Sequence, residues 1–150
     1  MGSVVPFTLA EDDYRRIAFM RDNLEIASGS PALNRRDSWH AIVRGARFVI
    51  TIHDESFLVL QREFKRFDKN RRRLEVLAQD DTLRWTVESV GRFAGHVKRV
   101  DRSLVGTLTR SGASCIAPTE TEQLLVAMLD ALQVRLVLSV PWIGLAFRGF

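Results

Sequence analysis

Apolar and polar residues alternate along this chain with a period that changes from one region to the next. From about residue 8 to residue 27, apolar side chains recur every three or four positions, which predicts an amphipathic helix. Thr8 and Glu11 have the spacing of a capping box at its start. A second short helix is expected after Pro31, because proline suits the first turn of a helix. The region of about residues 8–45 is therefore predicted to be helical.

From residue 47 onward the period becomes two, and the runs are rich in β-branched and aromatic residues, as in half-buried strands. Short polar turns separate these runs as far as about residue 115. Because connections this short join antiparallel neighbours, about residues 47–115 are predicted to form an antiparallel meander of about five or six strands. The segment Ser111-Gly112-Ala113-Ser114 is expected to end the sheet.

A C-terminal helix is predicted at about residues 119–133, where Thr119 and Glu122 form a second capping box. Its apolar stripe consists of Leu124, Leu125, Met128, Leu129 and Leu132. Residues 134–140 read VRLVLSV, which predicts a last strand. The predicted fold is a single α+β domain over residues 1–150. It has N-terminal helices, the meander, a C-terminal helix packed on one sheet face, and a final strand.

The composition is that of a globular chain about one domain in size. Its 150 residues are 46% hydrophobic and 27% charged, which argues against a disordered segment. The formal net charge is +4, and all but three of the 22 lysine and arginine residues are arginine. Arginine presents a planar fork of donors that matches phosphate, so this bias favours an anionic partner. A GC-rich coding sequence would produce the same bias.

The densest positive charge lies between two predicted strands, in the stretch QREFKRFDKNRRR. Only two carboxylates, Glu63 and Asp68, oppose it locally. The predicted phosphate contacts in this stretch are Arg62, Lys65, Arg66, Lys69, Arg71, Arg72 and Arg73. Because exposed aromatic rings stack on bases, Phe64, Phe67 and Trp39 are the predicted stacking residues.

Three further cations, Arg47, Arg84 and Lys98, occupy strand positions that can share the sheet face opposite the helix. Together with the basic stretch they predict a platform that binds RNA or DNA through phosphates, with weak sequence preference. The same charges have a second interpretation, a solvated turn whose cations protect a sheet edge from unwanted pairing.

Residues with catalytic or metal-binding potential are scattered. The three histidines, His40, His53 and His96, are not at metal-ligand spacing, so neither a metal site nor a cofactor is predicted. The sequence has no glycine-rich phosphate loop and no nucleophile motif, and the protein is predicted not to be an enzyme. A single cysteine, Cys115, and the lack of a secretory signal predict an intracellular protein, either cytoplasmic or nuclear.

The C-terminal tail supports a different functional interpretation. Residues 134–150 are apolar apart from Arg135 and Arg148, and an uncovered segment of this kind would be adhesive. Burial in its own fold or in a homodimer is expected, and docking of Trp142–Phe150 on a membrane surface is the less favoured alternative. The alternative function is thus a homo-oligomeric structural or adaptor protein, such as an assembly or matrix-like subunit, that uses its tail for protein or membrane contacts. No motif of a known family is recognised in the sequence.

Overall fold

The computed structural model describes residues 8–11, 15–33, 47–61, 73–91, 94–116 and 118–138. Ten strands form one antiparallel sheet in which spatial order follows sequence order from β1 to β10. The strands are β1 (Thr8–Glu11), β2 (Ile17–Arg21), β3 (Leu24–Ser30), β4 (Arg47–Ile52), β5 (Glu55–Leu60), β6 (Arg73–Leu77), β7 (Leu83–Gly91), β8 (Ala94–Arg99), β9 (Leu104–Thr109) and β10 (Gly112–Cys115). Two helices are described, α2 (Glu120–Ala131) and α3 (Arg135–Leu138).

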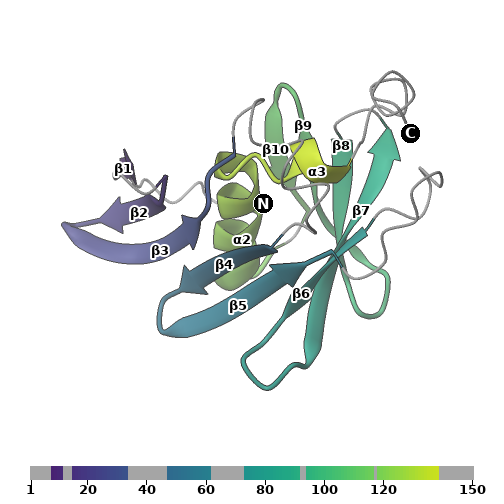
Figure 1. Cartoon of the computed structure of the whole chain (residues 1–150), viewed down its shortest axis with the longest axis horizontal. Helices are drawn as coiled ribbons and strands as arrows, with labels where there is room; N and C mark the ends of the chain where they lie inside the picture. The colour runs from purple at the N-terminus through teal and green to yellow at the C-terminus, as the bar shows by residue number, and fades with distance from the viewer. Residues whose placement is uncertain are drawn as a thin grey trace, which may run out of the picture.

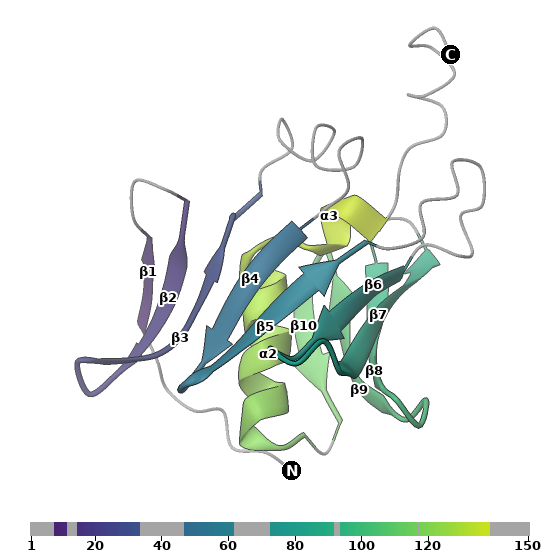
Figure 2. The same cartoon turned by 60° about the horizontal axis from the view of Figure 1, so that its bottom comes forward.

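The sheet curls into a half-barrel around α2, as Figures 1 and 2 show. The helix contacts β3 and β4 on one side and β9 and β10 on the other, so it lies on the concave face. Its apolar side chains Leu124, Leu125, Met128 and Leu129 are 0% exposed. A Cβ on Gly106 would lie 2.5 Å from the Ser114 carbonyl oxygen, so glycine is required where β9 packs closely between β10 and the helix. The helix therefore fills the interior of the half-barrel.

The prediction of N-terminal helices is wrong for the described residues between 8 and 33. They form β1, β2 and β3, and Thr8 and Glu11, predicted to cap a helix, pair with Met20 and Ile17 of β2. The reason is a turn between β2 and β3, where Asp22 and Asn23 both have positive φ, at 52° and 65°. Asp and Asn tolerate this conformation, and two such residues in succession favour a tight hairpin over a continuous helix.

The predicted α+β class is thus wrong, because the described residues form mainly one curled antiparallel sheet, and two further parts of the predicted fold are corrected. The described residues of 47–115 form seven strands instead of five or six, and Gly112–Cys115, expected to end the sheet, pairs with β9 as β10. The predicted final strand at 134–140 is helical over Arg135–Leu138, with an amide hydrogen bond from Val137 to the Val134 carbonyl of 3.0 Å. Its apolar run is buried against β7 and β8, and this packing suits one helical turn as well as a strand.

The helix predicted at 119–133 is confirmed as α2. Thr119 is its N-cap, and its hydroxyl accepts a hydrogen bond from the Glu122 amide at 3.1 Å. The Glu122 carboxylate in turn accepts from the Thr119 amide at 3.1 Å, which completes the capping box. The antiparallel meander and the packing of this helix on one sheet face are also confirmed. Within the described ranges, neither helix is long and apolar enough to cross a membrane.

Candidate nucleic-acid interface

The predicted binding residues fall into two groups. Most of them lie outside the described residues, namely Arg62, Lys65, Arg66, Lys69, Arg71, Arg72, Phe64, Phe67 and Trp39. The tail residues Trp142–Phe150 also lie outside. Four predicted cations are described: Arg47 on β4, Arg73 on β6, Arg84 on β7 and Lys98 on β8.

Three of the described cations, Arg47, Arg73 and Lys98, lie on the outer face of the sheet, away from α2. Arg84 instead lies at an irregularity in the pairing of β6 with β7, and its guanidinium is 5.3 Å from the centroid of the Trp85 ring. The strand neighbours of the first three, Phe48, Leu74 and Val97, are at most 1% exposed and belong to the core. Because side chains alternate between the two faces of a strand, the cations next to these core residues point outward. The backbone thus places Arg47, Arg73 and Lys98 on one face, and their contact with phosphate stays a prediction.

The strand register places these cations in cross-strand rows. Arg47 pairs with Leu60, Leu60 with Glu75, Glu75 with Thr86, and Thr86 with Lys98, so these five residues form one row across β4 to β8. With neighbouring strands about 4.8 Å apart, the row spans about 19 Å. In the next row Arg73 pairs with Glu88 and Glu88 with His96.

Arg47 and Arg73 also mark one end of the sheet. Arg47 is the first residue of β4 and pairs with Leu60, the last residue of β5. Arg73 is the first residue of β6, two positions before the partner of Leu60. The chain therefore leaves the sheet after Leu60 and returns at Arg73 beside outward-facing arginines. The residues between these points, 62–72, carry six of the predicted phosphate contacts and are called the basic segment below.

Carboxylates lie among the outer-face cations. The Lys98 ammonium is 3.0 Å from the Glu88 carboxylate, which also accepts hydrogen bonds from Arg102. The Arg73 guanidinium is 3.7 Å from Glu75. Burial alone would raise the pKa of Glu88, but the hydrogen bonds and charges of Arg102 and Lys98 lower it. The outer face is therefore basic in sum but has a mixed pattern of charge.

Thr86 lies at the centre of this pattern. Its residue is 5% exposed, and its hydroxyl oxygen has no hydrogen-bond partner in the described part of the chain. The cross-strand partners of Thr86 are Glu75 and Lys98, and Glu88 is its same-face neighbour along β7. A buried hydroxyl thus has three ionic neighbours on its face without a hydrogen bond to any of them.

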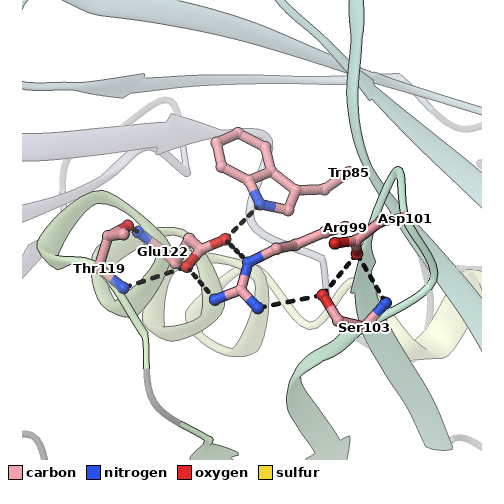
Figure 3. Close-up of polar contacts among 6 residues, drawn as sticks. All are labelled: Trp85, Arg99, Asp101, Ser103, Thr119 and Glu122. Carbon is pink, nitrogen blue, oxygen red and sulfur yellow. Dashed lines mark hydrogen bonds and ion pairs between the residues drawn. The ribbon is translucent and has the colours of Figure 1, made fainter.

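A second polar cluster lies on the inner face of the same strands, at the start of α2 (Figure 3). Both carboxylate oxygens of Glu122 are bonded to Arg99, whose Nε and Nη2 donate at 2.8 Å. The Trp85 indole N–H donates to the same carboxylate at 2.9 Å. Arg99 Nη1 donates to the Ser103 hydroxyl at 3.1 Å, and Asp101 accepts from the Ser103 amide at 2.9 Å. These contacts join β7, β8 and the turn after β8 to the helix.

The inner cluster stabilises the fold and leaves little capacity for a ligand. Burial alone would raise the pKa of Glu122, but hydrogen bonds from Arg99, Trp85 and Thr119, with the Arg99 charge, lower it to about 2. With Thr119 included, the Glu122 carboxylate accepts four hydrogen bonds, which is about its full capacity. Sequence reasoning assigned Glu122 only to the capping box, because its other partners are 23 and 37 positions away.

One further group of ionisable side chains lies near the start of α2. The Glu120 carboxylate is 2.8 Å from the Arg21 guanidinium and 3.7 Å from His53 Nε2. The side chains of Glu120 and His53 are about half exposed, at 50% and 47%. Within the described ranges no three His, Cys, Asp or Glu side chains are grouped as metal ligands. This surface group therefore contains an ion pair between Arg21 and the helix residue Glu120.

Comparisons with known proteins give no match of any kind. No protein-family model matches the chain, no curated protein is similar to it in sequence, and no solved structure matches its fold. Functional inference therefore depends on the residues themselves.

Proposed function

We propose that this protein binds nucleic acid through phosphate contacts, with the basic segment as the principal contact and the outer face of the sheet as its continuation. The supporting observation is the position of Arg47 and Arg73. Both lie on the outer face at the sheet end where the chain leaves for the basic segment and returns from it. Six cations and two carboxylates in that segment give it a formal charge as large as that of the whole chain, +4.

Two features of the described surface favour a polyanion over a lipid surface. The large apolar residues that are exposed lie on separate elements: Leu24, Val49, Val90, Val100 and Ile116. Scattered aliphatic side chains do not make the contiguous apolar patch that membrane docking needs. The concave face is filled by α2, so among the described residues the outer face is the surface open to a partner.

The proposal is tested by the salt dependence of binding to a labelled mixed-sequence DNA duplex and to one of its strands. For binding through phosphates, a plot of log affinity against log salt concentration has a steep negative slope, about 0.9 for each neutralised phosphate of a duplex. The variant R66A/R71A/R72A should weaken binding to any sequence and make that slope shallower by up to about three units.

Matched variants separate this effect from a general change in charge. R66K/R71K/R72K keeps the three charges and should retain most of the affinity, because a lysine also neutralises a phosphate. R110A removes one exposed charge from the turn between β9 and β10 and should leave affinity within about twofold. Unchanged binding by the alanine variant, or no nucleic acid bound by the wild-type protein, would rule out the proposal.

A further inference from the structure

The Thr86 hydroxyl is a feature of the outer face that folding alone does not account for. A buried hydroxyl without a partner destabilises the folded state, because it has given up its hydrogen bonds to water. Valine has nearly the same shape, favours strands, and would avoid this loss. The residue is 5% exposed, and its oxygen atom is inaccessible and unbonded in the described part of the chain.

Side chains of both charges lie around Thr86. The cations can bind an anion, and a carboxylate holds them when no anion is present. Lys98, the cross-strand partner of Thr86 on β8, supplies positive charge on the same face. Lys98 is held by Glu88 at 3.0 Å, and Arg102 donates to the same carboxylate. Because the side chains of Lys98 and Glu88 are 22% and 18% exposed, an anion from solvent can compete with Glu88 for the lysine.

We infer that Thr86 is the centre of a phosphate subsite, an inference that rests on the proposed function. In this subsite Lys98 exchanges Glu88 for a backbone phosphate of the nucleic acid. The movement of these long side chains uncovers the Thr86 hydroxyl, which donates a hydrogen bond to a phosphate oxygen. Glu88 then serves as an internal competitor that holds the cations in place when nucleic acid is absent.

The principal test is T86V, with T86S as its matched rescue. T86V should lower affinity for the DNA duplex by about five- to tenfold, since it removes one charge-assisted hydrogen bond. Its melting temperature should equal or exceed that of the wild type, because the unpaired hydroxyl is gone. T86S keeps the hydroxyl and should bind within about twofold of the wild type.

A second test uses a substitution that is expected to increase the affinity for the duplex. E88Q removes the competing charge and should tighten duplex binding by roughly two- to fivefold at low salt. E25Q makes the same change of charge on β3, where Glu25 pairs with Arg16, and should leave affinity unchanged. An increase in affinity on removal of an ion pair is not expected from a merely structural role.

The possible outcomes are distinct. Weaker binding by T86V with wild-type or higher stability, and recovery in T86S, supports the subsite. Wild-type affinity in T86V and E88Q, while R66A/R71A/R72A loses binding, overturns the subsite and leaves the proposed function standing. Parallel loss of affinity and stability in T86V also overturns it. Binding of the wild-type protein to phosphatidylserine vesicles and to neither nucleic acid would overturn both proposals.

Discussion

Trp85 and Thr86 are adjacent in β7, yet their side chains lie on opposite faces of the sheet and have different polar neighbours. On the inner face Trp85 donates to Glu122, which is also bonded to Arg99 and to the capping amide of Thr119. On the outer face the Thr86 hydroxyl has no hydrogen-bond partner in the described part of the chain, although Glu75, Glu88 and Lys98 are its neighbours. The polar atoms of the inner cluster are hydrogen-bonded to one another, whereas the Thr86 hydroxyl has no hydrogen-bond partner in the described part of the chain.

This comparison distinguishes the polar groups that stabilise the fold from those that can bind a partner. A saturated buried network stabilises one arrangement, and any anion would have to displace several hydrogen bonds to enter it. A buried hydroxyl without a hydrogen-bond partner lowers the stability of the fold, and a ligand that accepts a hydrogen bond from it offsets this loss. The inner cluster is therefore interpreted as the anchor of α2, and the outer cluster as a contact surface.

The largest expected effect is on the inner face. E122A should lower the free energy of unfolding by about 3 kcal/mol, because it leaves the buried Trp85 indole N–H without an acceptor and Arg99 without its carboxylate. E120A is the matched control on the same helical turn. Its ion pair is half exposed, so it should cost less than about 1 kcal/mol. Urea denaturation measures both values, and equal effects would mean that the inner cluster is not the anchor.

Acid should weaken the same anchor. The pKa of Glu122 falls from its ordinary 4.5 to about 2 in the folded protein, so its stabilisation is fully present above about pH 4.5 and is lost as the pH falls through 2. This contribution is at most about 3 kcal/mol. The stability gap between the wild type and E122Q should therefore narrow between pH 6 and pH 2. A gap independent of pH would contradict the charged, hydrogen-bonded state of Glu122.

Neighbouring residues of β9 extend the comparison between the two faces. G106A adds a methyl group where the Ser114 carbonyl oxygen is 2.5 Å and Val126 is 3.1 Å away, so it should cost about 2–3 kcal/mol. T107A, on the outer face, loses only a hydroxyl contact to Ser114 and should cost about 1 kcal/mol or less. The melting temperatures of the two variants test this order, and a larger loss in T107A would contradict a filled interior.

The smallest expected effect on stability is on the outer face. K98A removes one partly exposed ion pair with Glu88 and should change the free energy of unfolding by less than about 1 kcal/mol. Its effect should instead appear in binding, as a salt-dependence slope that is shallower by about one unit. A large loss of stability with an unchanged slope would place Lys98 with the anchor residues.

Local signals predicted the fold well where they were unambiguous. Thr119 and Glu122 define the start of α2, and short polar turns define the antiparallel hairpins after residue 47. The prediction for the N-terminal region was wrong because its apolar spacing suits a helix, while the decisive signal is the positive-φ turn at Asp22 and Asn23. In a short segment, two turn residues can outweigh the periodicity of the rest.

The site could be predicted only in outline. The sequence indicated which cations belong to strands, and the outward direction of Arg47 and Lys98 follows from alternation. The prediction that Arg84 shares this face missed the irregular strand pairing at that position. The surroundings of the Thr86 hydroxyl could not be predicted, because they depend on the strand register that places Glu75 and Lys98 beside it. The Glu122 network has the same origin, since no local pattern links a helix cap to Trp85 or Arg99.

The most direct test measures unfolding free energy and duplex affinity together in T86V and in E122Q. If the two faces have the separate roles assigned to them, T86V loses affinity at equal or higher stability, and E122Q loses stability while its folded form keeps wild-type affinity. If stability and affinity fall together in both variants, or if T86V binds the duplex as the wild type does, the division between anchor and contact surface is wrong.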